Sequence, residues 1–83
     1  PIMSAQLLNK YENKSVTFKY NGRDGTATLV HELSSGQYAL VKIKWVDQPL
    51  EDKTPILLTK DMVQMLQEIG GTLVLIYPRS NLR

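Results

Sequence analysis

The sequence contains no cysteine. This absence excludes disulfide scaffolds, thiolate zinc sites and cysteine nucleophiles, and it fits a reducing cytoplasm, which is the location we predict. No apolar run approaches the roughly 20 residues that cross a bilayer. The N-terminus also lacks the basic and apolar segments of a signal peptide, so we expect no membrane partner.

Histidine is scarce as well, because His31 is the single one. A metal site needs several converging donors and a nucleophile needs a nearby base, whereas the neighbour Glu32 points to the other side of a strand. The carboxylates Glu51 and Asp52 fall in a predicted loop, and Asp61 falls in a first helical turn, where it complements the helix dipole. A carboxylate pair for acid–base chemistry is the alternative. We predict no enzymatic activity, no catalytic residue, no metal and no cofactor.

The chain has 83 residues and a formal net charge of +2. A chain of this length forms one domain and buries only about 60–65% of its unfolded surface, so we expect a thin core. Because Pro1 and Ile2 before Met3 resemble a remnant of cloning, the predicted domain spans residues 3–78, followed by a frayed polar tail at 79–83. The charge is only weakly basic, and dedicated nucleic-acid binders are often more basic.

Alternating polar and apolar residues separated by glycine turns predict a small antiparallel sheet. In residues 15–20, Val16, Phe18 and Tyr20 point one way and polar side chains the other. Asn-Gly and Asp-Gly within residues 21–25 predict a hairpin turn with a bulge. The predicted strands are residues 15–20, 26–33 and 38–46, with a second turn at 34–37.

Two helices and a last strand complete the prediction. The segment 4–11 is a short helix that Ser4 can cap, and 60–69 is an amphipathic helix that begins after Thr59 and ends at Gly70. The nearly continuous apolar segment 72–77 is typical of a central strand. We expect it to pair with the first strand or with an edge, since an open edge would favour aggregation or dimerisation.

The predicted fold class is therefore α+β. It consists of a small curved antiparallel sheet, or a barrel-like sheet, with a short N-terminal helix and one amphipathic helix before the last strand. Large residues near the ends of both faces of the third strand favour strong curvature.

Lysines set into the sheet suggest single-stranded nucleic acid as the partner. Lys19, Lys42 and Lys44 fall at positions predicted to be polar, and Tyr38 shares the alternating face of the two later lysines. Ammonium groups that neutralise phosphates beside an aromatic ring suit single-strand binding, and Arg23 in the hairpin can extend the track. The alternative is a solvated face on which lysine stems cover apolar neighbours.

A protein partner is the rival interpretation. Trp45, Met62 and Met65 could form an apolar surface for a larger partner, as in a regulator or an inhibitor, although such a stripe is more often core. The last strand could instead form the seam of a homodimer, which would add burial to a thin core.

Two segments resemble known families. Residues 6–42 (QLLNKYENKSVTFKYNGRDGTATLVHELSSGQYALVK) resemble the first half of Sm-like small β-barrel RNA-binding proteins in their spacing of a short helix and three strands. The positions at which that family carries Asp and Asn are here Leu33 to Gly36, so the resemblance assigns no RNA-binding residue. Residues 41–69 are similar to the last strand, loop and helix of single-stranded-DNA-binding transcriptional coactivators, in which the helix mediates dimers.

Overall fold

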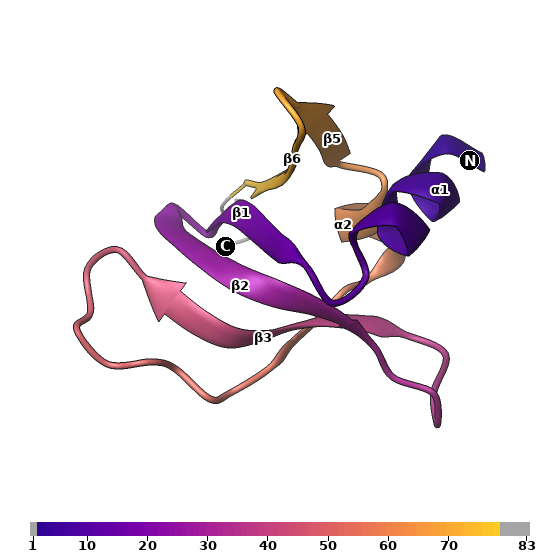
Figure 1. The fold of residues 1–83 in the computed structure, drawn as a ribbon. Helices are drawn as coiled ribbons and strands as arrows, with labels where there is room; N and C mark the ends of the chain where they lie inside the picture. Colours follow the sequence, from indigo (N-terminus) through magenta and orange to yellow (C-terminus); the bar gives the residue numbers. More distant parts are fainter. Residues whose placement is uncertain (1, 79–83) are drawn as a thin grey trace, which may run out of the picture.

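The structure, a computed structural model, describes residues 2–78, with side chains from residue 4 onward. A mixed α+β arrangement of one sheet and two short helices is visible in Figure 1. In chain order the elements are α1 (Ile2–Tyr11), β1 (Ser15–Tyr20), β2 (Arg23–His31), β3 (Tyr38–Trp45), β4 (Ile56–Leu57), α2 (Lys60–Val63), β5 (Leu66–Ile69) and β6 (Thr72–Tyr77).

The strands form a six-stranded sheet in the order β4-β3-β2-β1-β6-β5. β1, β2 and β3 are an antiparallel meander, and the last strand pairs with the first, as predicted. This β1–β6 pairing is parallel, so the expectation of a purely antiparallel sheet is wrong. β4 and β5 stay at opposite edges and the sheet is not closed, so the barrel-like alternative is not realised in the described residues.

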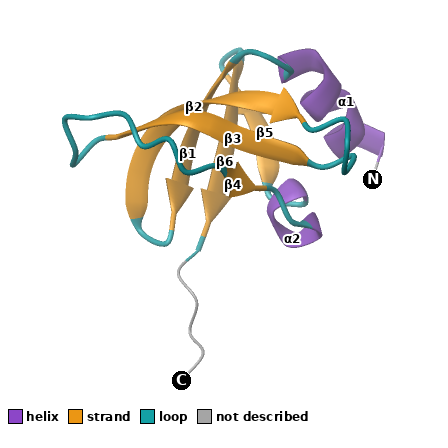
Figure 2. Cartoon of the chain, turned by 90° about the horizontal axis from the view of Figure 1, so that it is seen from below, coloured by secondary structure: helices purple, strands orange, loops and turns teal. Residues whose placement is uncertain are grey.

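The core lies on one face of the sheet, called the inner face below, and both helices lie together at one end of the sheet (Figure 2). Leu8 and Tyr11 from α1 and Met62 from α2 are buried against this face. Burying each large apolar side chain contributes about 2 kcal/mol of transfer free energy, and this burial holds the helices against the sheet. The largest fully buried side chains are Val16, Phe18, Leu29, Leu40, Ile43, Leu73 and Leu75.

The first hairpin confirms the turn prediction but is tighter than expected. Asn21 and Gly22 have φ angles of 52° and 85°, which is the left-handed pair of a two-residue turn. Arg23 already belongs to β2, so Gly25 is a strand residue. A Cβ atom on Gly25 would lie 3.0 Å from Phe18 Cζ and 3.1 Å from the Lys44 carbonyl oxygen, and this crowding explains the glycine.

The predicted helix over 60–69 is wrong in its second half. The Thr59 side chain caps α2 as expected, accepting a 3.3 Å hydrogen bond from the Met62 amide, but α2 has only 4 residues. Residues of the second half form β5, which pairs antiparallel with β6. Gly70 and Gly71, at φ 59° and 77°, are a hairpin turn rather than a helix stop. Pairing with β6 satisfies backbone groups that a longer helix would have left open on that strand.

Smaller corrections concern element ends. α1 starts at Ile2, so Ser4 lies inside its first turn and is not the cap. The second strand ends at His31, and Leu33 stands 88% exposed in the following turn. The predicted tail at 79–83 lies outside the described residues.

Candidate functional site

A β-bulge in β3 decides which lysines face outward. Thr26 pairs with Lys44 and Thr28 with Val41, so two residues of β3 stand opposite one residue of β2. Lys42 is one of the two and has φ 53°, a left-handed conformation rare for lysine. The extra residue resets the alternation, because Leu40 and Ile43 are both buried. The predicted common face of Tyr38, Lys42 and Lys44 is therefore wrong.

Lys42 and Lys44 come together on the outer face of the sheet. They line a shallow depression of about 230 Å³, called the lysine depression below, and both residues are exposed. Within residues 2–78, neither ammonium group lies within 4.0 Å of a carboxylate oxygen. Two lysines without ionic partners are thus available to an anion. The depression is also lined by Ser15, Thr26, Ala27, Thr28 and Glu51.

The other two predicted cations already have acidic partners. Lys19 Nζ lies 3.6 Å from Asp24 Oδ1 across the first hairpin. The Arg23 guanidinium donates to Asp47 through Nη2 at 2.7 Å and Nε at 3.1 Å. This bond holds the pKa of Asp47 below its ordinary value. The guanidinium also covers the Trp45 ring at 4.1 Å, so Arg23 packs as a structural residue.

Tyr38 does not join the lysines. It pairs with His31 on the inner face, and the two rings stack 4.3 Å apart at an interplanar angle of 10°. Burial raises the pKa of Tyr38. A second hollow lies beside it, with Leu8, Leu58 and Val63 among its walls. The predicted aromatic platform therefore lies on the opposite face of the sheet from Lys44.

The predicted protein-contact residues are mostly internal. Trp45 is buried and its Nε1 donates to Asp52 Oδ2 at 2.9 Å, a bond that lowers the pKa of Asp52. Met62 is 2% exposed and Met65 37% exposed. They form no common surface with Trp45, because two of the three are core residues.

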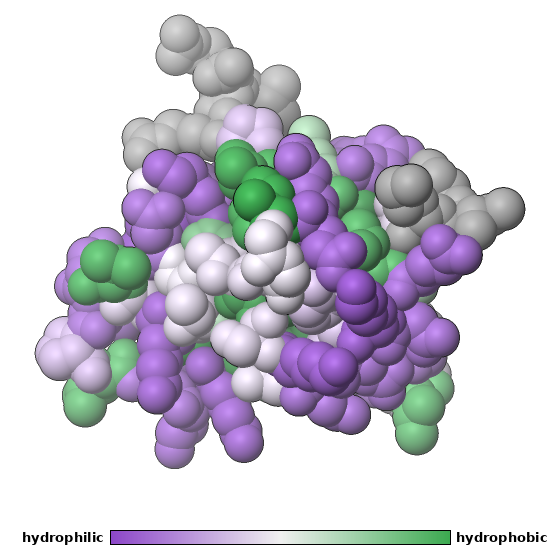
Figure 3. Space-filling model, turned by 45° about the horizontal axis from the view of Figure 1, so that its top comes forward, coloured by the Kyte–Doolittle hydropathy of each residue, from purple (hydrophilic) through white to green (hydrophobic). Residues whose placement is uncertain are grey.

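Apart from Met65, the exposed large apolar side chains are not those predicted as contacts for a larger protein partner. On the face shown in Figure 3, hydrophilic side chains predominate and apolar ones appear as separate groups. The large apolar residues with more than half of their surface exposed are Leu33, Val46, Leu50, Ile69 and Ile76. Leu57 is 50% exposed.

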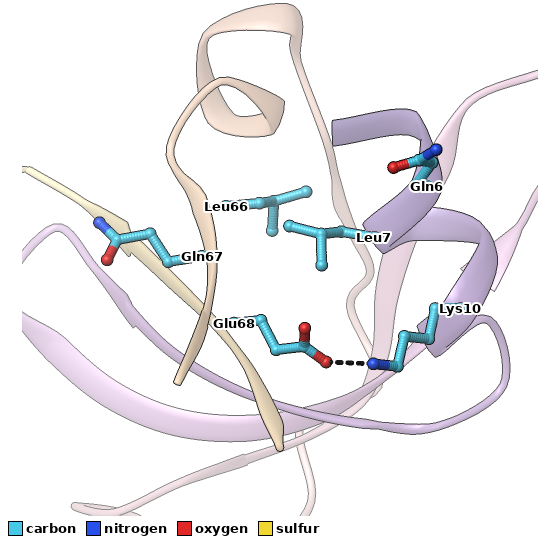
Figure 4. A pocket seen from close by; sticks show the side chains of 6 residues that line it. All are labelled: Gln6, Leu7, Lys10, Leu66, Gln67 and Glu68. Carbon is cyan, nitrogen blue, oxygen red and sulfur yellow. Dashed lines mark hydrogen bonds and ion pairs between the residues drawn. The ribbon is translucent and has the colours of Figure 1, made fainter. Parts of the chain in front are cut away.

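A hollow of about 570 Å³ separates α1 from β5 (Figure 4). Leu7 and Leu66 face each other across it, and Lys10 Nζ donates to Glu68 Oε2 at 2.6 Å. The Tyr11 hydroxyl donates to the same oxygen. These bonds lower the pKa of Glu68 and raise the pKa values of Lys10 and Tyr11. The cluster ties the helix to the edge strand.

Sequence reasoning missed this cluster because residues 66–69 were assigned to a helix. The Gly-Gly dipeptide between two short apolar segments was the signal that indicates a hairpin and hence the position of Glu68. The position of Glu51 beside the lysines was missed too, since it depends on how the 46–55 loop returns along β3.

No group of three or more metal-ligating side chains occurs within the described range. Neither helix of that range combines the length and apolarity needed to cross a membrane. Comparison of the chain with family models, with curated proteins and with solved structures gave no match. The two family resemblances therefore stay predictions.

Proposed function

We propose that this protein is a non-enzymatic module that binds single-stranded nucleic acid through the lysine depression. The observation that carries the proposal is the juxtaposition of Lys42 and Lys44 without acidic partners closer than 4.0 Å in the described part of the chain. Exposed ammonium groups attract phosphates and release condensed counterions when they bind them.

Hydroxyl groups beside the lysines support phosphate as the bound group. Ser15, Thr26 and Thr28 line the same depression, and a hydroxyl can donate a hydrogen bond to a phosphate oxygen. Because Tyr38 faces the other way, the proposed contact is to the backbone of the strand and not to its bases. We therefore expect little sequence preference.

The bulge itself supports a functional role for Lys42. A left-handed conformation costs a residue other than glycine about 1–2 kcal/mol, and bulges often re-aim a side chain beside a binding site. β3 has a lysine at φ 53°, a conformation that glycine would adopt without strain.

The test measures binding of a fluorescent 12-nucleotide oligo(dT) by anisotropy at several salt concentrations. We expect Lys44→Glu to weaken binding about tenfold and the double variant Lys42→Glu/Lys44→Glu to abolish it. The log–log salt slope of the wild type should be about −1.4, the value for two phosphates on a single strand. Circular dichroism checks that both variants are folded.

The matched control is Lys60→Glu, because Lys60 carries the same charge but lines the hollow beside Tyr38 instead. Its effect should stay below about twofold, which is the size of a long-range charge effect under screening. Equal losses in the two single variants, or binding that ignores salt, would refute the proposal.

Self-association is a second candidate, favoured by the open edge of β5 and not by the last strand, β6, which was the predicted seam but pairs with β1 and β5. This strand ends the sheet, and Ile69 beside its turn is 56% exposed. An antiparallel second copy, aligned with Gln67 opposite Gln67, brings Met65 of each copy against Ile69 of the other. Light scattering at 10 to 200 µM should then show a dimer that Ile69→Lys disrupts and Leu33→Lys does not. A monomer throughout this range would exclude it.

A further inference from the structure

Glu51 lies across from the lysines because the loop that carries it returns along β3. Ile43 N donates to the Asp52 carbonyl at 3.2 Å, and Asp52 N donates to the Ile43 carbonyl at 2.7 Å. This isolated bridge is antiparallel. In an antiparallel register the residue before Asp52 stands opposite the residue after Ile43, which places Glu51 opposite Lys44. Glu51 accordingly lines the lysine depression.

The loop is anchored on both sides of Glu51, so its position is built into the fold. On one side Asp52 accepts hydrogen bonds from Trp45 Nε1 at 2.9 Å and from the Thr54 amide at 3.0 Å. On the other side Asp47 is bound by Arg23. A loop held at both ends keeps the Glu51 carboxylate beside the depression at little further entropic cost.

We propose that Glu51 is an autoinhibitory charge of the lysine depression, an inference that rests on the proposed function. Glu51 lines the site, yet within residues 2–78 no ammonium group lies within 4.0 Å of its carboxylate oxygens. The acid therefore leaves both lysines free while repelling any phosphate that approaches them. A carboxylate so placed is an internal competitor for the anion.

This arrangement has a consequence for ligand choice. A single phosphate meets the two lysines and Glu51 at once, and the repulsion offsets much of the attraction. Each phosphate within a strand is a diester with one negative charge, whereas a mononucleotide or free phosphate carries close to two near pH 7. Glu51 therefore lowers the affinity for mononucleotides and free phosphate more than the affinity for a strand.

The test compares Glu51→Gln with Glu32→Gln, which removes the same charge from the turn after β2. Affinities for oligo(dT) and for thymidine monophosphate are measured at 50 mM and 300 mM salt, together with urea unfolding of each variant. We expect Glu51→Gln to tighten binding of oligo(dT) about fivefold at low salt and binding of thymidine monophosphate by a larger factor. Glu32→Gln should change either affinity less than about twofold. The difference between the effects of the two variants should be smaller at 300 mM salt than at 50 mM salt.

Equal effects of Glu51→Gln and Glu32→Gln, with lysine-dependent binding intact in the wild type, would overturn the inference and leave the proposed function standing. Absence of binding in the wild type and in Glu51→Gln would overturn both. Binding that is tighter in Glu51→Gln than in the wild type, and that is lost in the triple variant with Lys42→Glu and Lys44→Glu, would support both.

Discussion

The inner and outer faces of the sheet are formed by the same strands, but one face is buried and apolar and the other carries exposed charge. On the inner face, Phe18, Leu29 and Leu73 are at most 1% exposed and pack against both helices. On the outer face, Lys44 stands exposed beside threonines, without an acid within salt-bridge distance in the described residues. Burial on the inner face therefore stabilises the fold, whereas the outer face carries lysines that have no ionic partner in the described residues.

Substitutions on the two faces should therefore have different effects. A change on the inner face should alter stability and leave the binding residues as they are. A change on the outer face should alter binding with little effect on stability. The bulge at Lys42 is the place where the two faces depend on each other, since it turns Ile43 inward and Lys44 outward.

The largest expected effect comes from the centre of the inner face. Phe18 is 1% exposed and meets the Trp45 ring edge-on, with centroids 5.1 Å apart. Phe18→Ala should lower the free energy of unfolding by about 3–5 kcal/mol, because it leaves a cavity in a thin core. Urea unfolding followed by Trp45 fluorescence measures this. Thr17→Ala, one residue away on the outer face, is the control, and a similar loss there would remove the distinction between the faces.

Substitutions at the bulge residue Lys42 test how the two faces depend on each other. Lys42→Val should lower the free energy of unfolding by about 2 kcal/mol, because a β-branched residue is strained at a φ of 53°. Lys42→Gly removes the same cation but relieves the strain, so its stability should equal or exceed that of the wild type. Both variants should bind oligo(dT) more weakly. Equal stability of the two variants in thermal unfolding would argue against a left-handed Lys42.

Acid should act on the cluster that ties α1 to β5. Hydrogen bonds from Lys10 and Tyr11 hold the pKa of Glu68 below its usual 4.5. A carboxyl group with a depressed pKa in the folded state contributes stability that is present above the unfolded pKa and is lost as pH falls through the folded one. Below about pH 5 the wild type should therefore lose more stability than Glu68→Gln. Parallel pH profiles of the two proteins in urea unfolding would contradict this.

The smallest effect on stability is expected on the outer face itself. Lys44→Ala should change the free energy of unfolding by less than about 0.5 kcal/mol, because the ammonium has no ionic partner within residues 2–78 to lose. The same variant should weaken binding of oligo(dT). A stability loss above about 1 kcal/mol would show that Lys44 belongs to the structure rather than to a binding face.

Much of the first half of the fold could be predicted from local patterns. The alternation of Val16 and Phe18 with polar neighbours, and the Asn-Gly turn, are short-range signals that tertiary contacts did not overrule. The Thr59 cap was also correct, since a capping side chain acts within a single turn.

The candidate site was predictable only in part, for a physical reason. Lys42 and Lys44 could be singled out as outward lysines, but Tyr38 was placed with them because simple alternation was extended through a bulge. A bulge depends on how two strands meet, and the residue at φ 53° here is a lysine and not the glycine that would have signalled it.

The sequence by itself determined the elements whose signals are local: the first helix, the meander and the tight turn at Asn21. Tertiary structure decided whether residues 66–69 became helix or strand, because their apolar pattern fits both and pairing with β6 favours the strand that the Gly-Gly dipeptide allows. It also decided the direction in which the side chains of β3 point, and which acid stands beside Lys44. Both depend on contacts between segments distant in the chain, whose free energies no local pattern contains.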